Sequence, residues 1–358
     1  MSDMNEYKIV KITDLGTVNR GKSKHRPRND SILYGGEYPF IQTGDVKKAN
    51  LHLVDYTQTY NDVGLKQSKL WKKGTLCFTI AANIADSAIL GMDACFPDSI
   101  VGFLPYENVS DTTYVKYLFD ELKLYFQQIS KGTTQDNLSL DKICRVKLRV
   151  PEYDTQLKVA SILSTYDTAI ENNNKRIRLL EQMTENLYKE WFVRFRFPGY
   201  EDVEFEEKKP RGWQVGTEDK KHFAPTIFRY DEFGTIGSFV RGKNITAAQM
   251  IEGNIPDIWA ADCSYYQDDA TIWFVYNTLK YLQPVINNLQ CGAAQPHVYP
   301  KNINRLCILI PTEELIHKYN DSVKPYYDEI KVLNQHNQLL TQQRDLLLPR
   351  LMSGKLEV

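Results

Sequence analysis

A cluster of cationic side chains near the start of this 358-residue sequence is the first feature with the chemistry to bind an anionic ligand. Between Lys8 and Arg28 the sequence has seven lysines and arginines and one acid, Asp14. Cationic side chains contact nucleic-acid phosphates, and arginine and asparagine also hydrogen-bond to base edges. The cluster therefore predicts a DNA-contacting loop, with an ordinary solvated loop as the alternative. The predicted contact residues are Arg20, Lys22, Lys24, Arg26, Arg28 and Asn29.

The same segment matches a nucleotide-binding pattern letter for letter. Gly16–Ser23 fits G-x-x-x-x-G-K-[ST], the phosphate-binding P-loop. A functional P-loop follows a buried strand and opens directly into a helix. Here Pro27 and its cationic neighbours follow instead, and the counterpart Gly237–Asn244 lacks the final Ser or Thr. A P-loop protein is thus an alternative that the surrounding sequence disfavours.

Three further polar segments have side chains suited to DNA. Glutamine and asparagine pair with adenine edges, and threonine suits phosphate or the thymine methyl group. In the first half of the chain the predicted contacts are Thr133, Thr134, Gln135 and Asn137. In the second half they are Arg241, Lys243, Asn244, Gln295 and His297.

The sequence shows no arrangement typical of catalysis or metal binding. Its six histidines have no metal-ligand spacing, and its six cysteines contain no Cys-x-x-Cys pair. No Asn/Asp-Pro-Pro-aromatic methyltransferase motif is present, and Pro97-Asp98 lacks the Glu-x-Lys partner of a nuclease set. We therefore expect a binding subunit that is not an enzyme and holds no cofactor or metal of its own.

Composition limits the class of protein. No apolar run approaches the roughly 20 residues of a membrane span, and Met1–Lys8 does not resemble a signal peptide. Scattered cysteines indicate reduced thiols, so we expect a cytoplasmic protein without a membrane role. The net charge of −1 is low for a DNA-binding protein that acts alone. Any nucleic-acid binding must rely on local patches or on basic partner subunits.

Two long helices must organise these segments, because Pro151–Trp191 returns as Pro311–Leu351. Seam residues follow four-and-three spacing, which predicts a coiled coil formed by the two copies. The predicted seam is Val159, Leu163, Tyr166, Ile170, Asn173, Ile177, Leu180, Thr184, Leu187 and Trp191, matched by Tyr319, Val323, Tyr326, Ile330, Leu333, Asn337, Leu340, Arg344, Leu347 and Leu351. Polar seam residues usually reduce stability and determine register. Pro325 predicts a kink or a delayed start of the second helix.

A mixed segment precedes each long helix, which predicts an α+β protein with two α/β domains in a pseudo-two-fold repeat. In the first we expect strands near 38–43, 74–80, 99–104 and 143–150, and a helix over 114–129. The predicted boundaries are 1–150 for the first domain, 151–198 for its helical spacer, 199–310 for the second domain, and 311–358 for the second spacer and tail. Pro39 and Pro256 lie 217 residues apart, whereas Gly132 and Gly292 lie 160 apart, so the second domain is shorter by about 57 residues. We expect the missing part near Pro256-Asp257.

In this order of elements the chain resembles the specificity subunit of type I restriction–modification systems. The most specific stretches are Leu179–Met183 with Leu187–Gly199, and Arg344–Leu356. The resemblance implies two target-recognition domains, antiparallel helical spacers, and binding to double-stranded DNA. It also implies two methylation subunits and motor–nuclease subunits as partners, which would bind S-adenosylmethionine, ATP and Mg. Two similar but non-identical domains predict an asymmetric bipartite target. A coiled-coil scaffold without DNA recognition is the other alternative.

Overall fold

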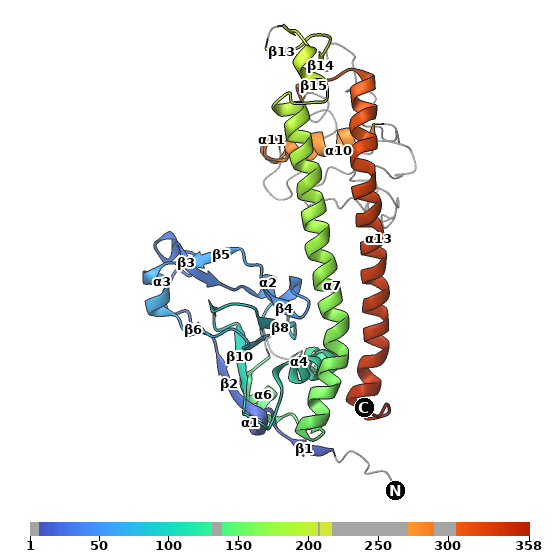
Figure 1. Cartoon of the computed structure of the whole chain (residues 1–358). Coiled ribbons are helices and arrows are strands. Elements are labelled where there is room, and N and C mark those ends of the chain that lie inside the picture. The colour runs from blue at the N-terminus through green and yellow to red at the C-terminus, as the bar shows by residue number, and fades with distance from the viewer. Residues whose placement is uncertain (1–6, 131–137, 207, 217–270, 290–305) are drawn as a thin grey trace, which may run out of the picture. The chain divides into compact units, whose positions relative to one another are not determined.

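The computed structural model (Figure 1) describes residues 7–130, 138–206, 208–216, 271–289 and 306–358. The chain divides into a first unit, residues 1–172 with 338–358, and a second unit, residues 173–337. Helices α7 (Tyr153–Tyr188) and α13 (Glu313–Met352) contribute residues to both units. Strands and long helices occur together, as the predicted α+β class requires.

Two sheets form most of the first unit. A five-stranded sheet has the order β2-β10-β7-β8-β4, and a four-stranded sheet has the order β5-β3-β9-β6. Paired strands are antiparallel except β4 with β8 and β3 with β9. The strands of the larger sheet are β2 (Gly16–Arg20), β4 (His52–Leu53), β7 (Leu76–Thr79), β8 (Ser87–Leu90) and β10 (Ile100–Pro105). Those of the smaller sheet are β3 (Tyr34–Phe40), β5 (Gln58–Tyr60), β6 (Leu70–Trp71) and β9 (Ala94–Cys95).

The central strands β7 and β8 are buried on both faces. Leu76 and Phe78 belong to a cluster with Tyr117 and Leu163, whereas Cys77 joins a second cluster around Trp71 and Phe96. Successive side chains of a strand point to opposite faces, so one sheet fills two cores. This accounts for the three consecutive apolar residues Leu76–Phe78 within the strand predicted at 74–80.

Short helices connect the strands. They are α1 (Ile12–Leu15), η1 (Ser31–Leu33), α2 (Thr43–Lys48), α3 (Asp62–Gln67), α4 (Thr112–Glu121), α5 (Lys123–Ser130) and α6 (Leu140–Arg145). The helix predicted over 114–129 is present but divides at Leu122 into α4 and α5. The strand predicted over 143–150 is wrong in its first part. Ser139 accepts a hydrogen bond from the Lys142 amide and caps α6, so only β11 (Leu148–Val150) is extended, paired with β1 (Lys8–Val10).

The second unit has an aromatic core. Trp191, Phe192, Phe274, Tyr319 and other residues form one buried cluster. Its elements include the π-helix η2 (Lys189–Val193), which directly follows α7, and η3 (Tyr200–Asp202), β12 (Phe205–Glu206), β13 (Lys209–Pro210), β14 (Gln214–Gly216), α10 (Ile272–Tyr281), α11 (Gln283–Asn288) and β15 (Ile308–Ile310). Strand β14 pairs antiparallel with β15.

Segments of α7 and α13 pair antiparallel in each unit. In the first unit Asp167 contacts Arg344, and in the second unit Asn173 contacts Asn337 and Thr184 contacts Tyr327. The predicted seam is correct at most positions but wrong at Tyr166 and Tyr326. Asp167 and Tyr327 are fully buried, while Tyr166 and Tyr326 are only half-buried.

The delayed helix start predicted from Pro325 is also wrong. Helix α13 begins at Glu313 and continues through Pro325 without interruption. Pro325 lies on the exposed face of the helix, as does Asp321 one turn earlier. Water can satisfy the Asp321 carbonyl that the missing proline N–H leaves free, so the helix tolerates the residue.

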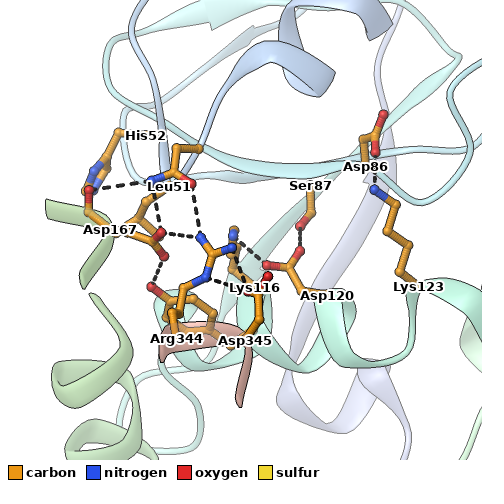
Figure 2. A network of polar contacts seen from close by, with 12 residues as sticks. Leu51, His52, Asp86, Ser87, Lys116, Asp120, Lys123, Asp167, Arg344 and Asp345 are labelled. Carbon is orange, nitrogen blue, oxygen red and sulfur yellow. Dashed lines mark hydrogen bonds and ion pairs between the residues drawn. The ribbon is translucent and has the colours of Figure 1, made fainter. Parts of the chain in front are cut away.

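A buried polar junction joins the globular part of the first unit to its helical pair (Figure 2). The Asp167 carboxylate accepts hydrogen bonds from the Tyr117 hydroxyl of α4, from Asn50 Nδ2 and from the Arg344 guanidinium. One turn later on α7, Glu171 accepts from the amides of Leu51 and His52. Two carboxylates on one helix face thus hold segment 50–52 against α7.

Candidate nucleic-acid interface

The basic loop directly follows strand β2, which is an edge strand of the larger sheet. Arg20, its last residue, pairs with Val101 of β10. Beyond the strand, the Gly21 amide donates to the Ile100 carbonyl (2.8 Å) and the Lys22 amide donates to the Phe96 carbonyl (3.0 Å). A Cβ at position 21 would lie 2.3 Å from the Pro97 carbonyl oxygen, so the close approach requires glycine here.

These contacts are incompatible with a P-loop. A phosphate cradle needs free backbone amides and a helix N-terminus directly after the glycine-rich turn. Here Gly16–Arg20 is a strand, and the next two amides bond to protein carbonyls. The Ser23 hydroxyl is buried, 3.4 Å from the Tyr60 hydroxyl. The alternative of a P-loop nucleotide-binding protein therefore fails on geometry.

The end of α3 holds the middle of the basic loop. Gln67 Oε1 accepts hydrogen bonds from the amides of Lys24 (2.6 Å) and His25 (3.0 Å). The adjacent Ser68 hydroxyl donates to the Lys22 carbonyl (2.7 Å). The three bonds satisfy loop groups that secondary structure does not use, and they determine which side chains can point outward.

Two of the six predicted contact residues in this loop are engaged within the protein. Arg26 Nη1 donates to the carbonyls of Ser23 and His25, both at 2.8 Å. Arg28 Nη2 donates to both Asp98 carboxylate oxygens, at 2.7 and 3.0 Å. These arginines stabilise the loop in this conformation.

A third internal contact closes the base of the loop. His25 Nε2 lies 2.9 Å from Asp30 Oδ2. This hydrogen bond and that of the Ile32 amide lower the pKa of Asp30. Asp30 also caps η1 by accepting from Ile32, so the loop leads directly into the next element.

Four predicted contact residues point a polar group to solvent. Arg20, Lys22, Lys24 and Asn29 are exposed, and their side chains form no ion pair or hydrogen bond among the described residues. Sequence reasoning missed three neighbours, namely Gln67, Lys66 and Lys69, which belong to a short Lys-Gln-Ser-Lys run. Lys66 and Lys69 flank the two residues that hold the loop, and Lys69 Nζ lies 3.6 Å from the Trp71 ring centroid.

The remaining predicted contacts lie outside the described residues. These are Thr133, Thr134, Gln135 and Asn137 in the first half, with Arg241, Lys243, Asn244, Gln295 and His297 in the second. The residues bordering the first group are described. Ser130 ends α5, and the Leu138 amide donates to the Ile80 carbonyl (2.9 Å).

Within the described part of the chain, no group of three or more His, Cys, Asp or Glu residues is arranged to hold a metal ion. Burial raises the pKa of the Cys77 thiol, which disfavours the reactive thiolate. No helix among the described residues is long and apolar enough to cross a membrane. The basic loop itself presents three cationic side chains, Arg20, Lys22 and Lys24, and the amide of Asn29 to solvent.

The chain matches the family described as "Type I restriction modification DNA specificity domain" over residues 4–182. The chain is also 25% identical to the type I restriction enzyme MjaIX specificity subunit of Methanocaldococcus jannaschii over 414 aligned positions, which cover 99% of this chain and 94% of that protein. Since 414 exceeds 358 by 56, at least 56 aligned positions have no residue from this chain.

Two further comparisons agree. The type I restriction enzyme HindI specificity subunit of Haemophilus influenzae is 28% identical over 204 residues, covering 54% of this chain and 42% of that protein. Among solved structures, the type I restriction–modification S subunit from M. genitalium aligns with a TM-score of 0.56 at 13% identity, covering 98% of this chain and 97% of that one. This likeness supports the fold of two domains with long paired helices.

Proposed function

Because the chain belongs to the family of type I restriction modification DNA specificity domains, we propose that it is the sequence-specific DNA-binding subunit of a type I restriction–modification complex. The observation that supports this most directly is the basic loop, which lies inside the matched residues 4–182. It presents Arg20, Lys22, Lys24 and Asn29 outward while Arg26 and Arg28 stabilise it from within. Ordered cations contact phosphates and orient neighbouring groups toward base edges.

The proposed target is bipartite and asymmetric. Two related but non-identical recognition domains, 1–150 and 199–310, would each read one half-site, and the spacers 151–198 and 311–358 would separate them. We place the shortening of the second domain near Pro256-Asp257. The 56 or more unmatched positions in the MjaIX alignment support a difference of that size.

The proposed partners follow from the family. The chain would dock two methylation subunits, and motor–nuclease subunits would join them. Chemistry would then reside in those partners, with S-adenosylmethionine on the methylation subunits and ATP and Mg on the others. The net charge of −1 suits this arrangement, because partner subunits can supply further phosphate contacts. We place the assembled complex in the cytoplasm.

The central test is methylome sequencing of DNA modified by this chain together with its methylation subunit. We expect adenine methylation in both halves of an asymmetric bipartite motif, lost when this chain is omitted. A motif with only one defined half would mean that the shortened second domain does not read bases. Normal assembly without any motif would favour the coiled-coil scaffold and refute the proposal.

A second test asks whether the solvent-facing lysines of the basic loop contact DNA phosphates. Lys22→Ala or Lys24→Ala should each reduce the slope of log K against log salt by about 0.9, the value for one lost phosphate contact. Lys72→Ala is the matched control, because Lys72 is also an exposed lysine but its ammonium pairs with Asp93 (2.8 Å). Equal slopes for all three variants would remove the basic loop from the interface.

A further inference from the structure

Three buried polar layers interrupt the apolar contact between α7 and α13. In the first unit, Asp167 is fully buried and pairs with Arg344, whose side chain is 15% exposed. In the second unit, Thr184 and Tyr327 are both buried and bond to each other at 3.0 Å.

The third layer, also in the second unit, is an amide pair. Asn173 Nδ2 donates to Asn337 Oδ1 at 2.8 Å. Asn337 Nδ2 in turn donates to the side chain of Asn174 at 2.9 Å. In each of the three layers, the polar group of one helix is matched by a polar group of the other.

The 160-residue repeat relates these layers to one another. Position 184 of α7 corresponds to 344 of α13, and position 167 corresponds to 327. The helices that contact these layers are equivalent as well, because Tyr117 of α4 and Asn277 of α10 are also 160 residues apart. Tyr117 donates to Asp167, and Asn277 donates to the Tyr327 hydroxyl. The two units thus place different chemistry, ionic in one and neutral in the other, at equivalent positions.

Part of the apolar seam is shared. Ile170 and its equivalent Ile330 are identical, as are Leu180 and Leu340, whereas Val159 and Leu163 correspond to Tyr319 and Val323. The shared positions do not distinguish a second α7 from α13 as a partner. Buried polar residues at single seam positions are known to specify partner and register in coiled coils.

We propose that the three polar layers select the α7–α13 pair and exclude pairing of either helix with its own copy from a second chain. In an antiparallel α7–α7 pair with the same register, Asp167 would face Thr184, and Asn173 would face Ile177. A buried carboxylate would lose its guanidinium, and an amide would lose its partner. The inference concerns assembly of this chain and is independent of DNA binding.

An α13–α13 pair would be mismatched in the same way. Arg344 would face Tyr327 and lose Asp167, leaving a largely buried cation without a carboxylate from the opposite helix. Asn337 would face Leu333. Removing one member of a buried polar pair costs far more than the pair contributes, so every mismatch acts against self-pairing.

The test exchanges the equivalent residues Thr184 and Arg344, which belong to the neutral layer and the ionic layer. In the full chain carrying both Thr184→Arg and Arg344→Thr, the introduced guanidinium would meet Asp167 only in an α7–α7 pair. The hydroxyl introduced at 344 would meet Tyr327 only in an α13–α13 pair. We expect the dimer dissociation constant, measured by sedimentation equilibrium or mass photometry, to fall on the order of 100-fold relative to the unchanged chain.

Each single variant is a matched control. Thr184→Arg alone leaves Arg344 facing Tyr327 in an α13–α13 pair, and Arg344→Thr alone leaves Asp167 facing Thr184 in an α7–α7 pair, so neither should dimerise as strongly as the double variant. A nitroxide carried at position 175, near the centre of an α7–α7 pair, should report a distance of about 20 Å or less, because paired helices lie about 10 Å apart. A dimer without that short distance would be a domain swap and would overturn the proposal.

A folded, monomeric double variant would also overturn it. If the double variant does not fold, a charge-free variant decides the question. Tyr117→Asn, Asp167→Tyr and Arg344→Thr together give the first unit the residues of the second. In this variant, both self-pairs place a tyrosine opposite a threonine, as the Thr184–Tyr327 layer does. Self-association above that of the unchanged chain would therefore support the proposal. Association equal to that of the unchanged chain would refute it.

Discussion

Replacing Arg344 by methionine tests the buried junction of the first unit most directly. The Asp167 side chain is fully buried and Arg344 is its paired cation, so Arg344→Met leaves a carboxylate without its counter-charge. Losing one member of a buried ion pair typically costs 3–5 kcal/mol. Because Tyr117 and Asn50 still donate to Asp167, we expect the lower end, about 3 kcal/mol in the free energy of unfolding of the first unit.

A double-mutant cycle isolates the ionic part of this cost. In the variant with both Asp167→Asn and Arg344→Met, the buried group is neutral, and we expect a total cost of about 1 kcal/mol. The coupling equals the sum of the two single costs minus the double cost, so it should be about 2 kcal/mol plus the cost of Asp167→Asn alone.

Hydrogen exchange is the suitable assay, because it reports local opening. Peptides covering residues 46–60 and 112–121 should lose protection about 100-fold in Arg344→Met. Peptides from α10, in the second unit, serve as the internal control. A cost below 1 kcal/mol, or no coupling in the cycle, would refute the reasoning that Asp167 depends on Arg344.

Three more predictions follow from the first unit. Ala82→Gly should raise the free energy of unfolding by about 1 kcal/mol in thermal denaturation, because exposed Ala82 has a φ of 61°, whereas Ala81→Gly should lower it. Gln67→Leu should weaken binding to the cognate site about tenfold without changing the salt slope, since it frees the loop but removes no cation. Burial raises the pKa of Glu171, but hydrogen bonds from His52 outweigh this and lower it. That stabilisation is complete above the ordinary carboxyl pKa of about 4.3 and is lost as pH falls through the lowered value, so acid unfolding should be shallower in Glu171→Gln than in the unchanged chain.

The sequence predicted the helical pair well because apolar spacing is a physical requirement of such a pair. It predicted one layer wrongly because an aspartate looks like a surface residue until its partners are known. Asp167 is buried only because Arg344, Tyr117 and Asn50 meet it, and these come from positions distant in the chain. Periodicity alone therefore assigned the layer to Tyr166.

The candidate interface, too, was only partly predictable from the sequence. Composition located the basic loop, since a dense run of cations is visible without a structure. It could not separate Arg26 and Arg28, which stabilise the loop, from Lys22 and Lys24, which face solvent. That distinction depends on carbonyls and on Asp98, brought close by folding. Gln67 had no signal in the sequence, because its role is to accept hydrogen bonds from amides 42 and 43 residues away.

The packing of Gly21 affects how genetic data on this chain should be read. In a nucleotide-binding protein, loss of activity on replacing the second glycine of G-x-x-x-x-G-K-[ST] is taken as a sign of phosphate binding. Here Gly21→Ala would place a methyl group against the Pro97 carbonyl and disable the chain by distorting it. A screen scored only by activity would thus report a nucleotide site that does not exist. Lys22→Ala is informative when nucleotide binding and complex assembly are measured directly, because its exposed side chain can be lost without disturbing the fold.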